Sequence, residues 1–404
     1  MNAVLEAKRS LQKEYQQLED VRYLNQKKVL SAYQSERVGA HCFTNSTGYG
    51  YDDAGRACLE GVFSTVFKGD AALVRPQIVS GTHAITLCLA LLNPGDQLVS
   101  LSGQPYDSLL PVIGTKGSST RSLLKRGIHY KEAPLDVNGR LDFERIRASV
   151  TMDTKMTMIQ RSRGYSWRPS ISIEEINQAF KIVKDCNPSC ICFVDNCYGE
   201  FVEAREPIEV GANLIAGSLI KNPGGTLAPS GGYIVGDSRL VQECAECLTA
   251  PGLGGKVGPT FGLIRPLLQG FYLAPHIVGE ALQGAMLAAQ VFHGQGYPVS
   301  PLAREPRTDI IQAIQMDSKA RLLAFCRGIQ KASPIDSQFL PIPDSMPGYE
   351  DPVVMAGGTF IQGSSIELSA DAPLRSPYIV YLQGGMCIEQ VELGIESILT
   401  ELQA

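Results

Sequence analysis

Short segments that favour strands recur along the first half of the chain, separated by polar and glycine-containing segments. They lie at residues 72–79, at the beginning of 97–109, and at 155–160, 191–194 and 214–220, and the last two are apolar runs. Continuous apolar runs of this length are typical of strands buried on both faces of a parallel sheet. The pattern therefore predicts a large α/β domain with polar residues at the strand ends.

Segments of helical composition surround these runs. Residues 4–38 are almost free of Gly and Pro and predict a helix or helix pair that stops at Gly39. Further helices are expected at 85–92, 240–249, 271–293, 316–332 and 388–402. From about residue 297 short strands alternate with helices, which is typical of a small α+β domain. The expected organisation is an N-terminal helical segment (1–40), a large domain (41–270), and a linker helix with a small C-terminal domain (271–404).

Composition narrows the class of protein. The chain has 404 residues, of which 44% are hydrophobic and 19% charged, with a formal net charge of -5. This size and balance describe a large globular protein, and the negative charge argues against nucleic acid or an acidic membrane as partner. We find no apolar segment of signal-peptide or membrane-spanning length and expect a cytoplasmic protein.

Cysteine and histidine usage gives no metal site. Eleven cysteines without a secretory signal are best interpreted as reduced thiols that pack as small apolar groups. The pair Cys244 and Cys247 forms a lone CxxC without a second pair or a histidine at ligand spacing, and the five histidines form no HExxH motif. We therefore expect no metal.

One segment carries the chemistry. The run 191–194 ends in Asp195, and the run 214–220 ends in Lys221, 26 positions later, just before a glycine-rich turn. Active sites in open α/β sheets collect at strand ends, and an unpaired buried lysine is costly. Pyridoxal phosphate needs a lysine for its Schiff base and an acid for its pyridinium nitrogen. Ser218, three residues before the lysine, can reach a phosphate oxygen.

Two other interpretations of this segment are open to the residues alone. An aspartate and a lysine often form a solvated or salt-bridged pair, although the apolar approach to both residues argues against it here. Ser-x-x-Lys is also the nucleophile motif of penicillin-binding serine hydrolases. Those proteins carry Ser-Asp-Asn and Lys-Thr-Gly as well, and neither tripeptide occurs in this chain.

Three phrases extend the pattern: VDNCYGEF at 194–201, GSLIKNPGG at 217–225 and APSGGYIVG at 228–236. With them the chain resembles the methionine γ-lyase/aluminium-resistance family, a relative of the cystathionine lyases. The resemblance covers about residues 40–400. It implies the fold type I architecture of pyridoxal-phosphate enzymes, like that of aspartate aminotransferase, with a mostly parallel sheet in the large domain and a small C-terminal α+β domain. It also implies a homodimer or homotetramer with shared active sites.

The resemblance gives roles to residues around the cofactor. Gly81 and Thr82 follow a strand and open a helix, where free N–H groups suit a phosphate. Tyr106 is the nearest aromatic residue in the loop that carries the stacking ring in the family, and His83 is the other flat group in reach. In related lyases a loop after the N-terminal helices crosses to the neighbouring subunit's phosphate, for which Tyr51 and Arg56 are the candidates.

Arginines complete the predicted site. Arg161 and Arg163 follow the run 155–160, and the resemblance favours a substrate- or cofactor-facing position for both. Arg375, in the phrase ELSADAPLR at 367–375, takes the place of the arginine that holds the substrate carboxylate in fold type I enzymes. Guanidinium donors match the two oxygens of a carboxylate.

The expected activity is elimination of a sulfur group from cystathionine, cysteine or methionine, at Cβ or Cγ, after the lysine removes the Cα proton. The same residues would serve an aminotransferase, which would need a keto-acid acceptor and release no net ammonia. A third hypothesis is a non-catalytic metal-tolerance protein with the same fold. The presence of Asp195, Ser218, Lys221 and Arg375 argues against it.

Overall fold

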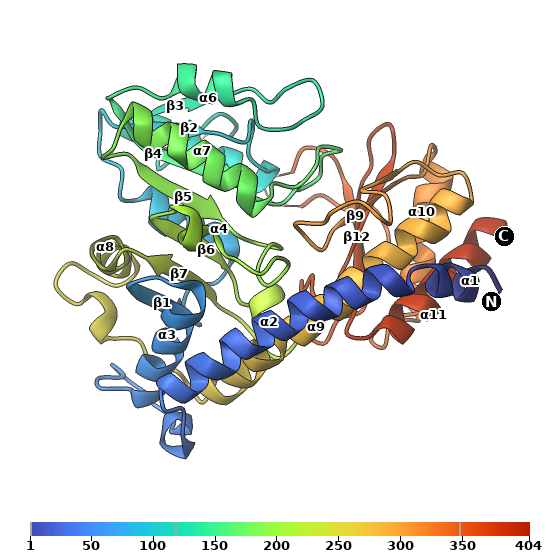
Figure 1. Cartoon of the computed structure of the whole chain (residues 1–404), viewed down its shortest axis with the longest axis horizontal. Coiled ribbons are helices and arrows are strands. Elements are labelled where there is room, and N and C mark those ends of the chain that lie inside the picture. The colour runs from blue at the N-terminus through green and yellow to red at the C-terminus, as the bar shows by residue number, and fades with distance from the viewer. Residues whose placement is uncertain (1, 118, 347–348) are drawn as a thin grey trace.

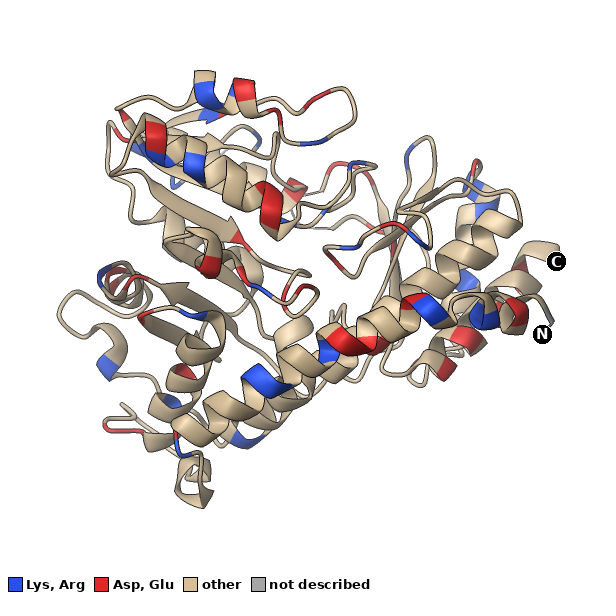
Figure 2. Ribbon diagram, viewed as in Figure 1, with Lys and Arg blue, Asp and Glu red and all other residues tan. Residues whose placement is uncertain are grey.

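The computed structural model describes residues 2–117, 119–346 and 349–404. A seven-stranded sheet and a five-stranded sheet lie at opposite ends of the molecule, and two long helices run side by side along both (Figure 1). Acidic and basic residues are interspersed over both parts and along the long N-terminal helix (Figure 2). None of the described helices combines the length and the apolar character that crossing a membrane requires.

The large sheet has the strand order β1-β7-β6-β5-β4-β2-β3. Its strands are β1 (Ala71–Arg75), β2 (Gln97–Ser100), β3 (His129–Glu132), β4 (Thr154–Gln160), β5 (Ile191–Asp195), β6 (Leu214–Ser218) and β7 (Gly232–Gly236). Only β7 runs antiparallel to its neighbours. Every residue of β5 and β6 is buried, as expected for strands covered on both faces.

Helices cover both faces of this sheet. They are α3 (Ala54–Phe67), α4 (Gly81–Leu89), α5 (Leu110–Ile113), α6 (Phe143–Ser149), α7 (Ile173–Cys186) and α8 (Ser238–Leu248). One apolar core joins α3 and α7 to one face, and a second joins α4 and α8 to the other. Helix α7 begins where the Ser172 and Glu175 side chains cap each other's backbone N–H, which fixes the chain between β4 and β5.

The small sheet is antiparallel, with the order β10-β11-β12-β9-β8. Its strands are β8 (Val299–Ser300), β9 (Gln312–Gln315), β10 (Val353–Ala356), β11 (Ser369–Pro373) and β12 (Ile379–Gln383), and its helices are α10 (Lys319–Lys331) and α11 (Ile388–Gln403). A separate apolar core forms here with residues of the N-terminal helix and of the last turns of the long linking helix.

The N-terminal segment forms α1 (Asn2–Ser10) and α2 (Gln12–Ser35), and α2 packs along α9 (Ile264–Gly294). Helix α9 begins seven residues before the predicted start at 271. Pro266 was compatible with this earlier start because it lies in the first helical turn, where a backbone N–H has no intrahelical acceptor.

Gly270 on α9 brings this helix into direct contact with the turn that follows β6. A Cβ at Gly270 would lie 2.0 Å from the carbonyl oxygen of Gly224, and one at Gly225 would lie 2.1 Å from the carbonyl oxygen of Gly270. Gly225 also has a φ of 48°, in the left-handed region. The turn is therefore fixed against α9 by backbone contact alone.

Candidate active site

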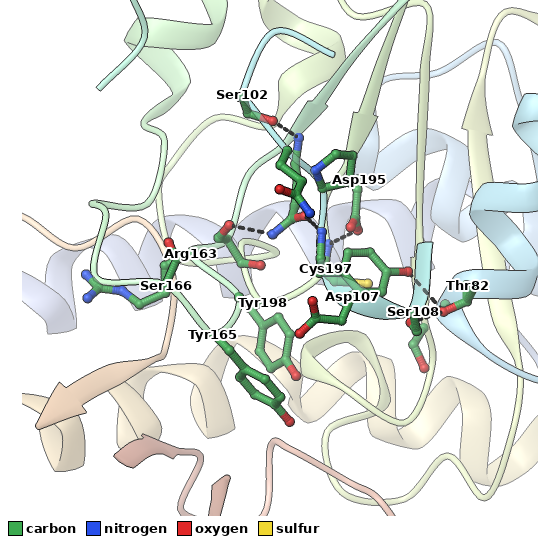
Figure 3. A pocket seen from close by; sticks show the side chains of 18 of the residues that line it. Thr82, Ser102, Asp107, Ser108, Arg163, Tyr165, Ser166, Asp195, Cys197 and Tyr198 are labelled. Atoms are coloured by element: carbon green, nitrogen blue, oxygen red, sulfur yellow. Dashed lines mark hydrogen bonds between the residues drawn. The ribbon is translucent and has the colours of Figure 1, made fainter. Parts of the chain in front are cut away.

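A cavity of about 690 Å³ opens at the carboxyl ends of the central strands, on the side of the large sheet that faces the small sheet. Strand β5 ends in Asp195, and its neighbour β6 ends in Ser218, three residues before Lys221. The two strands are parallel and paired, with Asp195 opposite Ala216. Asp195, Ser218 and Lys221 all line the cavity, and Asp195 lies deep within it (Figure 3).

Lys221 is half-buried, and its Nζ lies 4.0 Å from the centre of the Tyr198 ring. Burial lowers the pKa of Lys221, but the acidic groups of Cys197, Tyr198 and Asp195 outweigh it, so the pKa lies well above the ordinary lysine value. The amine is therefore an ammonium at neutral pH in the chain by itself, placed over an aromatic face and within the field of the Asp195 carboxyl group.

Asp195 is 4% exposed, and its Oδ1 accepts a hydrogen bond of 3.2 Å from the backbone N–H of Cys197. Burial raises the pKa of this carboxyl group, while the charge of Lys221 and the bond from Cys197 oppose the rise. A carboxyl group in this setting exchanges or shares a proton readily with a basic nitrogen placed beside it.

Helix α4 points its first turn at the cavity. The Ser80 hydroxyl accepts the backbone N–H of His83 at 3.1 Å, and Gly81 and Thr82 line the cavity. The first amides of a helix have no intrahelical acceptor and favour anions. A Cβ at Gly81 would lie 3.2 Å from the sulfur of Cys197 and 3.4 Å from Cβ of Ser218. The backbone thus approaches β5 and β6 closely, at a place where a larger residue would crowd the cavity.

The Tyr106 side chain crosses the cavity wall next to this turn. Its hydroxyl lies 2.9 Å from Oγ1 of Thr82, and its backbone N–H donates to Oε1 of Gln160 at 2.7 Å. Gln160, the last residue of β4, donates its own N–H to the Ser102 hydroxyl at 2.9 Å. This chain of bonds ties the loop after β2 to the end of β4 and fixes the ring of Tyr106 over the strand ends.

The opposite wall is aromatic and basic. Tyr165, Tyr198 and Tyr349 line it, and the rings of Tyr165 and Tyr198 lie close together in Figure 3. Arg163 is 2% exposed and donates to the carbonyl oxygen of Ser300 at 2.8 Å, which ties the large part of the molecule to the small one. Burial lowers the pKa of Arg163, and the charge of Asp309 counteracts this.

Arg375 reaches the cavity from the loop after β11 of the small sheet. Its Nη2 donates to the carbonyl oxygen of Tyr165 at 3.0 Å, and its Nη1 lies 3.2 Å from Oδ2 of Asp351. The side chain is 46% exposed, so it lies where the cavity meets solvent. Basic groups from both parts of the molecule therefore face one space above Lys221.

Comparison with known proteins assigns the chain to a family. The family model for methionine gamma-lyase matches residues 1–403. The chain belongs to the methionine gamma-lyase family. A candidate cystathionine beta-lyase involved in aluminum resistance from Listeria monocytogenes is 47% identical, with a TM-score of 0.97 and 99% of both chains covered. A carbon-sulfur lyase involved in aluminum resistance from Clostridium novyi is 46% identical, with a TM-score of 0.95 over 99% of this chain and 94% of that one.

A more distant structure confirms the fold type I architecture. The pyridoxal-5'-phosphate dependent protein YhfS from Escherichia coli has a TM-score of 0.63 at 16% identity, over 95% of this chain and 97% of that chain. At this identity the likeness shows the fold alone. The sequence-based prediction of the family and of its fold is therefore confirmed, including the mostly parallel large sheet.

Most of the residues predicted for the site line one cavity. Lys221, Asp195, Tyr106, Gly81, Thr82, Ser218, Arg163 and Arg375 do so. His83, the alternative to Tyr106 as the stacking group, does not line the cavity. Its Nδ1 accepts the backbone N–H of Val79 at 3.3 Å. Of the two flat groups, only Tyr106 is therefore in a position to contact a ligand there.

Arg161 does not line the cavity, in contrast to the prediction that it faces substrate or cofactor. It is fully buried, and its guanidinium bonds Oε2 of Glu203 at 2.7 Å and Oδ1 of Asn196 at 2.8 Å, with Glu206 at 3.7 Å. Glu203 and Glu206, about 40 positions downstream, bind the Arg161 guanidinium and keep it out of the cavity. Arg161 is a structural residue behind the end of β4.

Tyr51 and Arg56 also lie away from the cavity of their own chain. The Arg56 guanidinium is buried and donates to the carbonyl oxygens of Gly50, Gly258 and Lys256 at 2.6, 2.8 and 3.1 Å. Tyr51 is 60% exposed and stacks on the exposed Tyr49, with ring centres 5.4 Å apart. Arg56 thus holds the glycine-rich turn at 251–258, whereas Tyr51 presents a ring to the outside.

Sequence reasoning missed part of the aromatic wall. Tyr198 follows Asp195 by three residues, so its place after a central strand was a usable signal. Tyr349 comes from a proline-rich stretch of the small part of the molecule, and no local pattern pointed to it. Cys197 is one of the cysteines predicted to pack as small apolar groups, and it also lines the cavity, beside Gly81. In the described ranges no cluster of His, Cys, Asp and Glu has the spacing of a metal site.

Proposed function

We propose that the chain is a pyridoxal-phosphate-dependent carbon–sulfur lyase. Its substrate would be a sulfur amino acid of the cystathionine, cysteine or methionine type, from which β- or γ-elimination releases a thiol, an α-keto acid and ammonia. One observation carries the proposal. Lys221 and Asp195, at the ends of two adjacent parallel strands, face the same cavity as the first turn of α4.

The residues present fit pyridoxal phosphate. Lys221 supplies the amine that binds its aldehyde, and the carboxyl group of Asp195 suits its ring nitrogen. The first-turn amides of Gly81 and Thr82, with the Ser218 hydroxyl, suit its phosphate. When bound, the cofactor supplies an electron sink for the carbanion formed at Cα.

Proton transfer and substrate binding would be carried out by side chains of the protein. Lys221 is held as an ammonium in the chain by itself, so it must lose a proton before it can bind the cofactor or accept the Cα proton at Nζ. Asp195 keeps a proton at the ring nitrogen. Arg375 and Arg163 bind and orient the substrate carboxylate, and the ring of Tyr106 limits the mobility of the ligand. The departing sulfur takes the electron pair of the broken C–S bond and a proton.

Assembly into a homodimer or a homotetramer forms part of the proposal. The stacked pair of Tyr49 and Tyr51 is 72% and 60% exposed, on a loop whose inner side is held by Arg56. Because the guanidinium of Arg56 is used within its own chain, Tyr51 is the better candidate to reach a neighbouring subunit's phosphate.

The test begins with the cofactor. Protein incubated with pyridoxal phosphate should gain a visible absorption band, and borohydride reduction followed by peptide mass mapping should locate the pyridoxyl group on Lys221. Lys221→Ala should lose band and label, whereas Lys125→Ala, which alters an exposed lysine outside the cavity, should keep both. A wild-type protein that never takes up the cofactor would refute the proposal.

The reaction is tested next with L-cystathionine, L-cysteine and L-methionine. A lyase releases keto acid and ammonia together without an added acceptor. Keto acid that forms only when a second keto acid is supplied, with no net ammonia, would identify an aminotransferase instead. Cofactor binding without any reaction would favour the non-catalytic hypothesis.

A further inference from the structure

Residues 349–351 form a short segment of the small part of the molecule at the rim of the cavity, here called the acidic strap. Tyr349 lines the cavity, and its ring centre lies 5.4 Å from that of Tyr165. The next two residues are acidic and each contacts a base that lines the cavity. Glu350 lies 2.9 Å from Nζ of Lys116, and Asp351 lies 3.2 Å from Nη1 of Arg375.

These contacts give each terminal nitrogen of Arg375 one partner, while the side chain stays 46% exposed. One of its terminal nitrogens faces Asp351, and the other donates to the carbonyl oxygen of Tyr165. A guanidinium binds a carboxylate best through two parallel donors, so a carboxylate that uses both terminal nitrogens has to replace the Asp351 oxygen. Asp351 would therefore compete with a substrate carboxylate for Nη1 of Arg375.

We propose that Asp351 is a built-in competitor for the substrate carboxylate, and that its exchange at Arg375 releases the acidic strap. The inference rests on the proposed function, because it takes an amino acid as the ligand. Arg375 and Asp351 are 46% and 38% exposed, so their ion pair is partly solvated and weak enough to exchange. Glu350 with Lys116 forms a second anchor, with exposures of 73% and 35%, which does not involve Arg375.

The Asp351–Arg375 pair should select for ligands that carry a carboxylate. A ligand gains the Arg375 position only if it carries a carboxylate, since an amide or ester cannot replace the charge of Asp351. Tyr349 moves with the strap because it is the adjacent residue, so release of Asp351 also changes the aromatic wall of the cavity. Carboxylate recognition and access to the aromatic wall are thereby linked.

The first experiment is binding of L-norleucine, a sulfur-free amino acid that cannot undergo elimination, to cofactor-loaded protein by calorimetry. L-norleucinamide, which lacks the carboxylate, is the matched ligand. Asp351→Asn should bind norleucine about two- to five-fold more tightly than wild type, the range expected from removing a solvated ion pair, and norleucinamide unchanged. Glu350→Gln, which cuts the Lys116 contact and keeps the Asp351–Arg375 pair, should raise norleucine affinity less than Asp351→Asn does and leave norleucinamide affinity unchanged.

Equal norleucine affinities in Asp351→Asn and wild type would overturn the inference, and so would the same gain in norleucinamide affinity. Norleucine that binds no variant would refute the proposed amino-acid site and the competitor role with it.

A second measurement needs no ligand. Hydrogen exchange of the backbone amides at 349–351 should be faster in Asp351→Asn than in wild type. Unchanged exchange would show that the ion pair does not hold the strap, whatever the substrate.

Discussion

A buried carboxyl group near Lys221 should make the stability of this protein strongly dependent on pH. Glu200 is fully buried, and its Oε1 accepts a hydrogen bond of 2.7 Å from the hydroxyl of Tyr233. Its other oxygen has no hydrogen-bond partner in the described part of the chain. Burial raises the pKa of Glu200 from 4.5 to about 8, while the bond from Tyr233 and the charge of Lys221 oppose the rise.

The sign and size of the effect follow from proton binding. Between pH 4.5 and 8 the folded chain keeps a proton on Glu200 that the unfolded chain has lost, so the free energy of unfolding falls as pH rises. The stability that this proton on Glu200 contributes is fully present below about pH 4.5 and lost by about pH 8. The slope is about 1.4 kcal/mol per pH unit, or about 3–4 kcal/mol between pH 5 and pH 8.

Glu200→Gln removes the titrating proton but keeps an oxygen for the hydroxyl of Tyr233. Urea unfolding followed by the fluorescence of Trp167, the only tryptophan, should show the difference in stability between variant and wild type growing by about 3–4 kcal/mol from pH 5 to pH 8. Tyr233→Phe removes the bond that lowers the Glu200 pKa and should extend the loss of stability to higher pH without changing its slope. Parallel pH profiles of wild type and Glu200→Gln would refute the reasoning.

Two further substitutions separate cofactor binding from structure. Gly81→Ala puts a Cβ at 3.2 Å from the Cys197 sulfur and should weaken pyridoxal phosphate binding about tenfold in an absorbance titration. Adding Cys197→Ala to the same chain should reduce this loss. Equal losses with and without Cys197→Ala would contradict the crowding argument. Arg161→Met leaves Glu203 and Glu206 without their buried partner and should lower the free energy of unfolding by about 3–5 kcal/mol in urea titrations. Cofactor affinity in folded Arg161→Met should stay unchanged, and a large loss would return Arg161 to the site.

Local pattern was sufficient for the centre of the site and insufficient for its rim. Asp195 and Lys221 each end an apolar run, and the strands that carry them are neighbours, so sequence alone placed them together. Arg161 and Arg163 looked equivalent in sequence, because both follow β4. The partners that distinguish them, Glu203 and Ser300, are distant along the chain.

The same limit applies to the loop that carries Arg56. Its three carbonyl partners include two in the turn after α8, about 200 residues away, and no sequence spacing reveals such a contact. The start of α9 was placed too late for a different reason. Pro266 and Gly270 are residue types that usually interrupt helices. Here Pro266 lies in the first turn of the helix, where proline is tolerated, and Gly270 is required because the backbone of Gly224 packs against it.

Through that glycine contact, the helix that joins the two parts of the molecule also supports the turn that follows Lys221. At Gly224, Gly225 and Gly270 the two backbones meet directly, so a shift of α9 at this point would move the turn after Lys221 with it. The position of Lys221 therefore depends on α9, the same helix that carries the small sheet. A tilt of this helix would move Arg375 and Lys221 together, so that under the proposed function one rigid element would set the distance between the groups that bind the two ends of an amino acid.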